Sequence, residues 1–192
     1  MTMKTNNRDL KQILINALIE LANKKDFNSI TVKDICLNCE VSRQAFYYHF
    51  SGIYELLGYF YKTESDKILK ESQNQESLKV AFVNLMYWGL KNRNILISTY
   101  NSAQRDSVEN FMYRIINPYI INIIAERSKA LNITDEQSAF IAKYYTLSIN
   151  AIYLDWLKHG MQEEPEVLVN NASLLLTGGF ERTLLNFNKN NH

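Results

Sequence analysis

The chain has 192 residues, of which 46% are apolar, so it can build a sizeable core without disulfides or metals. Only six glycines and two prolines occur, too few for the frequent tight turns of a β-sandwich or β-barrel, and the composition favours an all-α fold. Lys and Arg number 21 against 20 Asp and Glu. This balance excludes a global field that attracts nucleic acid or an anionic membrane, so any DNA contact must be local.

Cysteine usage and the first residues of the chain indicate a cytoplasmic protein. The two cysteines, Cys36 and Cys39, lie too close together to staple a fold. The chain is polar through Asp9, unlike the apolar core of a signal peptide. No window reaches the ~18 uninterrupted apolar residues of a membrane span, because two asparagines and a proline interrupt the strongest candidate, Ile115–Ala125. We therefore expect no membrane partner.

Three helices are predicted in the first 50 residues. Apolar residues at spacings of three and four predict the first, from about Leu10 to Lys25. Thr31 opens a second helix of about two turns, in which Asp34 completes a capping box. Ser42 caps a third short helix over residues 43–50. Two short helices joined by a tight turn are typical of a helix-turn-helix head.

The rest of the chain is also predicted to be helical, giving about nine helices in all. We place a head at residues 1–52, a connecting helix at 53–73 and a larger C-terminal helical domain at 74–192. The predicted later helices are Ile53 to Leu69, Leu78 to Lys91, Ile95 to Ala103, Val108 to Lys129 with a kink at Pro118, Asp135 to His159 capped by Thr134, and Pro165 to Asn186.

The third helix carries residue types that read base edges in a major groove. Arg43 can fork onto a guanine edge, Gln44 can pair with adenine, and Tyr47 can reach a thymine methyl or a phosphate. Other nearby residues are of kinds that grip phosphates and fix the register without reading sequence. These are Thr31, Lys33, Ser42, Tyr48 and His49.

The segments Thr31–Cys36 and Val41–Phe50 resemble the DNA-binding signature of the TetR/AcrR family of bacterial one-component regulators, over about residues 9–57. The resemblance implies a homodimer whose heads bind a palindromic operator. It also implies variable C-terminal helices that hold the dimer face and commonly an effector pocket. Carried over by position, Arg43, Gln44 and Tyr47 read bases, whereas Lys33, Tyr48 and His49 contact the backbone.

The chain departs from this family at three places. Glu40 stands where the family usually has a glycine in the turn, so a left-handed conformation there carries roughly 1 kcal/mol of strain. Ser51-Gly52-Ile53 stands where the family often offers a lysine to phosphate, so we expect that contact to be absent or made by Ser51 and main-chain amides. Cys36 and Cys39 replace small alanines and keep small apolar volume.

The C-terminal part is similar to one branch of the family, the dihydroxyacetone-kinase regulators. The similarity rests on Tyr54–Leu57, Tyr153–Met161 and Pro165-Glu166. Some members of that branch are activators that work with a protein coregulator. We therefore leave open whether this chain represses or activates, and whether a small molecule or a coregulator controls it.

Aromatic residues suggest a ligand pocket, and stripes at helical spacing on the last two predicted helices, together with the resemblance, suggest a dimer interface. For any single aromatic residue, ordinary core packing is the alternative. Packing within one subunit is the alternative for the stripes. The candidate pocket residues are Tyr100, Phe111, Tyr113, Tyr119, Tyr144, Tyr145 and Trp156, and the candidate interface residues are Tyr145, Ile152, Leu168, Ala172, Leu175 and Gly179.

Other interpretations apply to some of these residues. Cys36 and Cys39 have the spacing of half a zinc site or of a redox pair, but no second pair exists, so helix packing is favoured over thiol sensing. His49 is either a phosphate contact or a core histidine. Arg43 and Gln44 are ordinary solvated residues if the head is a purely structural bundle.

Two other classes of function compete with a regulator. A helical effector- or protein-binding module with degenerate DNA binding is favoured by Glu40 and by the missing lysine. A small helical enzyme lacks a nucleophile and base pair, a metal cluster and a phosphate loop in this sequence. We therefore expect no catalytic residues, no metal and no cofactor.

Overall fold

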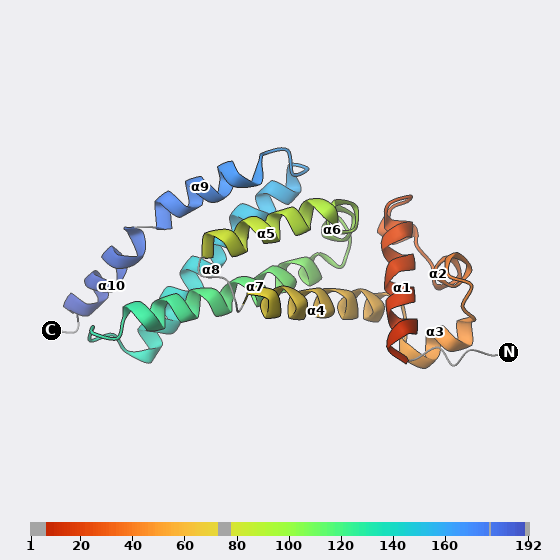
Figure 1. The fold of residues 1–192 in the computed structure, drawn as a ribbon, viewed down its shortest axis with the longest axis horizontal. Helices are drawn as coiled ribbons and strands as arrows, with labels where there is room; N and C mark the ends of the chain where they lie inside the picture. Colours follow the sequence, from red (N-terminus) through yellow and green to blue (C-terminus); the bar gives the residue numbers. More distant parts are fainter. Residues whose placement is uncertain (1–6, 73–77, 177, 191–192) are drawn as a thin grey trace. The chain divides into compact units, whose positions relative to one another are not determined.

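The computed structural model describes residues 7–72, 78–176 and 178–190, and the regular elements in these residues are all helices, joined by turns and loops (Figure 1). The predicted all-α class is confirmed. Within that part of the chain there are ten α-helices and one short 3-10 helix. They are α1 (Asn7–Ala22), η1 (Phe27–Ser29), α2 (Val32–Asn38), α3 (Arg43–His49), α4 (Ile53–Ser72), α5 (Leu78–Lys91), α6 (Arg93–Tyr100), α7 (Arg105–Arg127), α8 (Asp135–Lys158), α9 (Pro165–Leu176) and α10 (Gly179–Asn190).

The main difference from the predicted elements lies in the last helix. A single helix from Pro165 to about Asn186 was expected, but α9 ends at Leu176 and α10 begins at Gly179. Gly178 has a φ of 41°, in the left-handed region that glycine adopts without a Cβ clash, so it ends a helical run easily. The predicted domain boundary between residues 73 and 74 lies outside the described residues.

The chain divides into two compact units. The first consists of the chain up to Asp66 together with Asn92–Val108, and it contains the head. In it, α2 packs on α1 and also on α3 (Figure 1). The side chains of Leu14, Ile35 and Phe46 are fully buried. These apolar side chains come from the stripes whose spacing predicted the three helices, so local periodicity accounts for the core of the head.

Helix α6 packs on α1 and η1 within this unit. Phe27, whose side chain is buried, begins η1, and its backbone N–H donates to Ser98 Oγ of α6 at 2.6 Å. Ile95 and Leu96 of α6 have no exposed surface. A segment about 70 residues away in the chain therefore completes the core beside the head.

The second unit contains the rest of the chain, from Lys67 to Lys91 and from Glu109 onward. Tyr153 and Trp156 of α8 are buried in its core, and the Trp156 Nε1–H donates to the Glu163 carbonyl at 2.9 Å. A Cβ on Gly89 of α5 would collide with the Tyr153 hydroxyl, so only glycine allows this close approach. Among the described residues, no helix is both long and apolar enough to cross a membrane.

Candidate nucleic-acid interface

The turn between α2 and α3 is set by one left-handed residue. Glu40 has a φ of 57°, and the N–H of Val41 donates to the Cys36 carbonyl at 3.0 Å. This 6→1 bond across a left-handed residue is a Schellman motif, which ends a helix and turns the chain sharply. The left-handed conformation expected at Glu40 is therefore present, and the strain of its Cβ with it.

Helix α3 begins directly after this turn. Ser42 Oγ accepts from the Ala45 N–H at 3.1 Å, which satisfies one free amide of the first turn. Phe46 and Phe50 are buried against the head. A helix that buries this face exposes the opposite face to solvent, so the residues of its first turn point away from the core.

The outward face of α3 holds the predicted base-reading residues. Arg43, Gln44 and Tyr47 are exposed, and Tyr48 is exposed beside them. Arg43 and Tyr47 are four residues apart and so share one face of the helix. Within the described part of the chain, Arg43 makes no ion pair. Its guanidinium can therefore bind a new partner without breaking an internal bond.

The predicted phosphate-contact residues at α2 differ in their availability. Lys33 is exposed, and no ion pair involves it within the described residues. Thr31 is exposed, but its hydroxyl accepts from the Asp34 N–H at 3.2 Å and its N–H donates to Asp34 Oδ2 at 2.8 Å, which together form the predicted capping box. The hydroxyl also donates to Asp34 Oδ2 at 2.7 Å. Lys25 Nζ also lies 2.7 Å from Asp34 Oδ2. This hydrogen bond and those from Thr31 hold the pKa of Asp34 well below its usual range.

Ser51, just before α4, is already hydrogen-bonded to Glu55. Its N–H and hydroxyl both lie within 2.8 Å of Glu55 Oε2, and these bonds lower the pKa of Glu55. The carboxylate therefore stands near the place where the sequence suggests a phosphate contact. Ser51 can donate to a phosphate only after Glu55 has moved away.

The ring of His49 is half-buried, with its edge packed against Tyr48 at 5.0 Å between centroids. Next to it, Lys11 of α1 lies over the rings of Phe50 and Tyr59, at 5.5 and 4.6 Å from their centroids. These cation–π contacts hold α1 against the end of α3 and the first part of α4. Sequence reasoning missed Lys11, because it stands among polar residues on the flank of the apolar stripe.

The two cysteines support packing rather than thiol chemistry. Cys36 is buried, and burial raises the pKa of both Cys36 and Cys39. The Cys39 thiol donates to the Ile35 carbonyl at 3.0 Å. A raised pKa keeps a thiol protonated and unreactive. In the part of the chain that is described, no group of three or more His, Cys, Asp or Glu side chains gathers to hold a metal.

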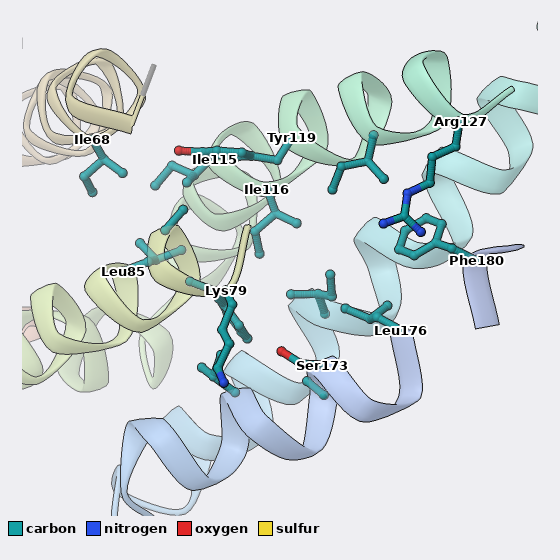
Figure 2. A pocket seen from close by; sticks show the side chains of 16 residues that line it. Ile68, Lys79, Leu85, Ile115, Ile116, Tyr119, Arg127, Ser173, Leu176 and Phe180 are labelled. Carbon is teal, nitrogen blue, oxygen red and sulfur yellow. The ribbon is translucent and has the colours of Figure 1, made fainter. Parts of the chain in front are cut away.

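Residues predicted for the pocket fall in different places. Tyr119 lines a cavity of about 440 Å³ against α5, α7 and α9, which we call the α5–α9 pocket (Figure 2). Tyr144 and Tyr145 line a second cavity of about 610 Å³ along α8, α9 and α10, which we call the α8–α10 groove. The other four line neither cavity: Tyr100 packs under Arg105, Phe111 packs on Trp88, Tyr113 is partly exposed, and Trp156 is buried.

The predicted interface residues gather along the α8–α10 groove, with one exception. Leu175 is 76% exposed on α9. Tyr145 and Ala172 also line the groove but are mostly buried within the unit. Ile152 and Gly179 line it and are half-buried, whereas Leu168 is half-buried and lines neither cavity.

Comparisons with known proteins agree with this geometry. Residues 14–59 match the family model described as "Bacterial regulatory proteins, tetR family", and residues 76–178 match that of a "Transcriptional regulator C-terminal region". No curated protein sequence matches the chain at a significant level. Several solved structures are similar in fold, and two of them are regulators with names that state a role. The dihydroxyacetone kinase operon activator DhaS has a TM-score of 0.73 and 19% identity, over 89% of this chain and 96% of that one. The fatty acid degradation regulator FadR from Bacillus halodurans has a TM-score of 0.67 and 15% identity, over 88% and 95%.

The exposed α3 face and the matched helical domain define a helix-turn-helix, DNA-binding transcriptional regulator. The C-terminal model alone covers more than half of the chain. The chain belongs to the TetR family, as the motifs around Thr31 and Ser42 predict.

We predict that Glu40→Gly raises the free energy of unfolding by about 1 kcal/mol, because glycine removes the left-handed strain of a Cβ. Urea denaturation of the full chain measures it. Glu40→Ala is the matched control, because it removes the carboxylate and keeps the Cβ, and we expect little change from it. Equal stability of the glycine and alanine variants would contradict the strain at this position.

The Asp34 carboxylate predicts a pH-dependent stability of the head. Its folded pKa lies below the unfolded value of about 3.9, so it stabilises the fold above that pH and loses this effect as pH falls toward the folded pKa. Asp34→Asn should therefore lower the urea midpoint at pH 7, by an amount that shrinks below about pH 4. Glu163→Gln, at an exposed site, serves as control. A difference between wild type and Asp34→Asn that stays constant from pH 7 to pH 3 argues against this role.

Proposed function

We propose that the chain works in the cytoplasm as a homodimer that binds a palindromic operator and is controlled by an effector or a coregulator. The observation that carries this proposal is the outward face of α3, where Arg43 is exposed and makes no ion pair among the described residues. Residues 1–52 serve as the head, 53–73 as the connecting helix and 74–192 as the regulatory domain. The protein has no catalytic role.

On α3 the proposed roles divide along the helix. Arg43, Gln44 and Tyr47 contact base edges from the first turn and a half, where a recognition helix meets the groove. Tyr48 and His49 follow and contact the phosphate backbone, as do residues of the preceding helix and turn. The remaining proposed backbone contacts are Thr31, Lys33, Ser42 and Ser51.

Dimerisation is supported by an apolar stripe on α8 and α9. Phe140, Tyr144 and Leu147 recur at spacings of four and three on α8 and are 62%, 60% and 48% exposed. Leu174 and Leu175 of α9 are 79% and 76% exposed. Soluble monomers seldom expose so many large apolar side chains together, and two copies of the stripe can cover each other about a twofold axis.

Control follows from the spacing that two heads must keep. Half-sites centred about 34–36 Å apart accept only a dimer whose recognition helices have the matching separation. A ligand or a coregulator that prefers one separation shifts DNA affinity without touching DNA. A coupling of about 1–3 kcal/mol is enough for regulation.

The second candidate is a helical binding module with degenerate DNA binding. The observation that favours it is the bond between Ser51 and Glu55, because the carboxylate occupies donors that a phosphate would otherwise use. A chain of this kind keeps the dimer and the pocket and binds its own upstream DNA no better than unrelated DNA.

Arg43→Ala should weaken binding to the DNA upstream of the chain's own coding sequence by about 5- to 150-fold, from the loss of about 1–3 kcal/mol of base contact. Fluorescence anisotropy on matched and scrambled duplexes measures it. Lys33→Ala should weaken both duplexes alike and lower the salt slope by about one. Lys158→Ala, in an exposed position on α8, controls for lost charge. Unchanged affinity of Arg43→Ala would overturn the base-reading assignment.

Leu175→Glu should convert the dimer to a monomer, because it places a charge in the apolar stripe. Sedimentation velocity of the full chain measures the species, and circular dichroism checks that the helices are kept. Val80→Glu puts the same charge at an exposed apolar site of α5 and should leave the dimer intact. A wild-type monomer, or a Leu175→Glu dimer of wild-type affinity, would refute the interface.

A further inference from the structure

The α5–α9 pocket is a cavity of about 440 Å³ within the second unit, which is a usual size for a small-molecule site. Its walls are mainly aliphatic, and several helices contribute to them (Figure 2). The residues of the wall include Phe82, Leu85, Ile115, Ile116, Val169 and Leu176. Such a lining favours a ligand with an apolar body, because burying apolar surface is the main gain on binding.

Two positively charged side chains, Lys79 and Arg127, line this cavity, and no Asp or Glu does so among the described residues. Figure 2 shows them apart: Lys79 extends from α5 toward α9, which carries Ser173, and Arg127 extends from α7 toward Phe180. Both cations therefore belong to the lining, but they act at different places.

The two cations differ in how far their charge is balanced. Arg127 Nη1 pairs with Glu181 Oε1 at 3.5 Å, so a carboxylate already compensates its charge. Lys79 has no ion pair within the described residues. Among the described residues, the cavity thus combines an apolar wall with one positive charge that no carboxylate pairs with, that of Lys79, which extends from α5 toward α9.

We propose that the pocket binds an organic anion with an apolar body, whose anionic group pairs with Lys79. This inference rests on the effector-controlled regulator proposed above and specifies its effector. An anionic group that lies against this apolar wall gives up part of its hydration, and the exposed Lys79 side chain supplies an opposite charge in return. An organic cation meets Lys79 and Arg127 with no carboxylate in the described lining. A strongly polar anion, such as a sugar phosphate, finds few polar groups in the aliphatic wall.

Titration calorimetry of the full-length protein tests the ligand class with three probes of one chain length. Octanoate, 1-octanol and octylammonium share an apolar body and differ in the charge of the head. We expect octanoate to bind about tenfold more tightly than 1-octanol, as for a hydrogen bond to a charged group, and octylammonium to bind least. Equal binding of octanoate and 1-octanol would overturn the anion, and no binding of either would overturn the pocket.

Variants locate the charge. Lys79→Met keeps the length of the side chain and removes its charge, so it should reduce octanoate affinity about tenfold and leave 1-octanol unchanged. Lys91→Met, at an exposed position on the same helix and outside the pocket lining, should change neither. If Lys79→Met binds octanoate as the wild type does, the pairing with Lys79 is wrong. Unaltered 1-octanol binding by Lys79→Met shows that the cavity has remained folded.

A carboxylate and a phosphate share the chemistry that Lys79 recognises. Octyl phosphate is therefore titrated in the same way as octanoate. Whichever of the two anions binds more tightly identifies the preferred head group. Operator binding is measured separately, with and without saturating octanoate. Octanoate that binds through Lys79 without changing DNA affinity leaves the ligand class standing and counts against its role as an effector. If the wild type without octanoate binds its own upstream DNA no better than a scrambled duplex, the result counts against the proposed regulator and not against the pocket.

Discussion

The left-handed conformation of Glu40 is the constraint on which the head depends. It closes the bond from Val41 to the Cys36 carbonyl, ends α2 and lets Ser42 cap α3 two residues later. Helix α8 ends with the same motif, but there Gly160 takes the left-handed position with a φ of 74°, and the Met161 N–H donates to the Trp156 carbonyl. The same hydrogen bond thus forms with and without a Cβ at the first left-handed residue, although after α8 Met161 is left-handed as well, with a φ of 54°. At Glu40 the bond from Val41 and the cap at Ser42 hold a residue that disfavours this conformation.

After this turn, the two faces of α3 differ in the polarity and burial of their side chains. Phe46 and Phe50 bury one face, which leaves Arg43 and Tyr47 on the other. The near-neutral net charge is compatible with this arrangement, because binding then depends on a few placed contacts rather than on a general attraction. Sequence-specific binding through a few α3 side chains is therefore consistent with a chain whose net charge attracts DNA only weakly.

Local signals in the sequence were sufficient for the head, and long-range contacts were not visible there. The caps at Thr31, Ser42 and Thr134 are encoded within three residues of each helix start and were all predicted. The bond from Phe27 to Ser98 joins residues 71 apart, so no local pattern indicates it. The lining of the ligand cavity was harder to predict from the sequence than either. Aromatic residues were expected to line it, but only Tyr119 of those predicted lines the α5–α9 pocket, because aliphatic side chains from separate helices meet there.

Helix α6 belongs to the same compact unit as α1, α2 and α3, although the stretch Lys67–Lys91 of the other unit comes between them in the chain. The first unit is therefore not a contiguous fragment. A truncated chain that stops before Asn92 lacks the buried Ile95 and Leu96 and leaves the Phe27 N–H without its acceptor. Excising the DNA-binding half at a sequence boundary thus removes part of its own core, and an autonomous version needs both stretches of chain rejoined by a linker.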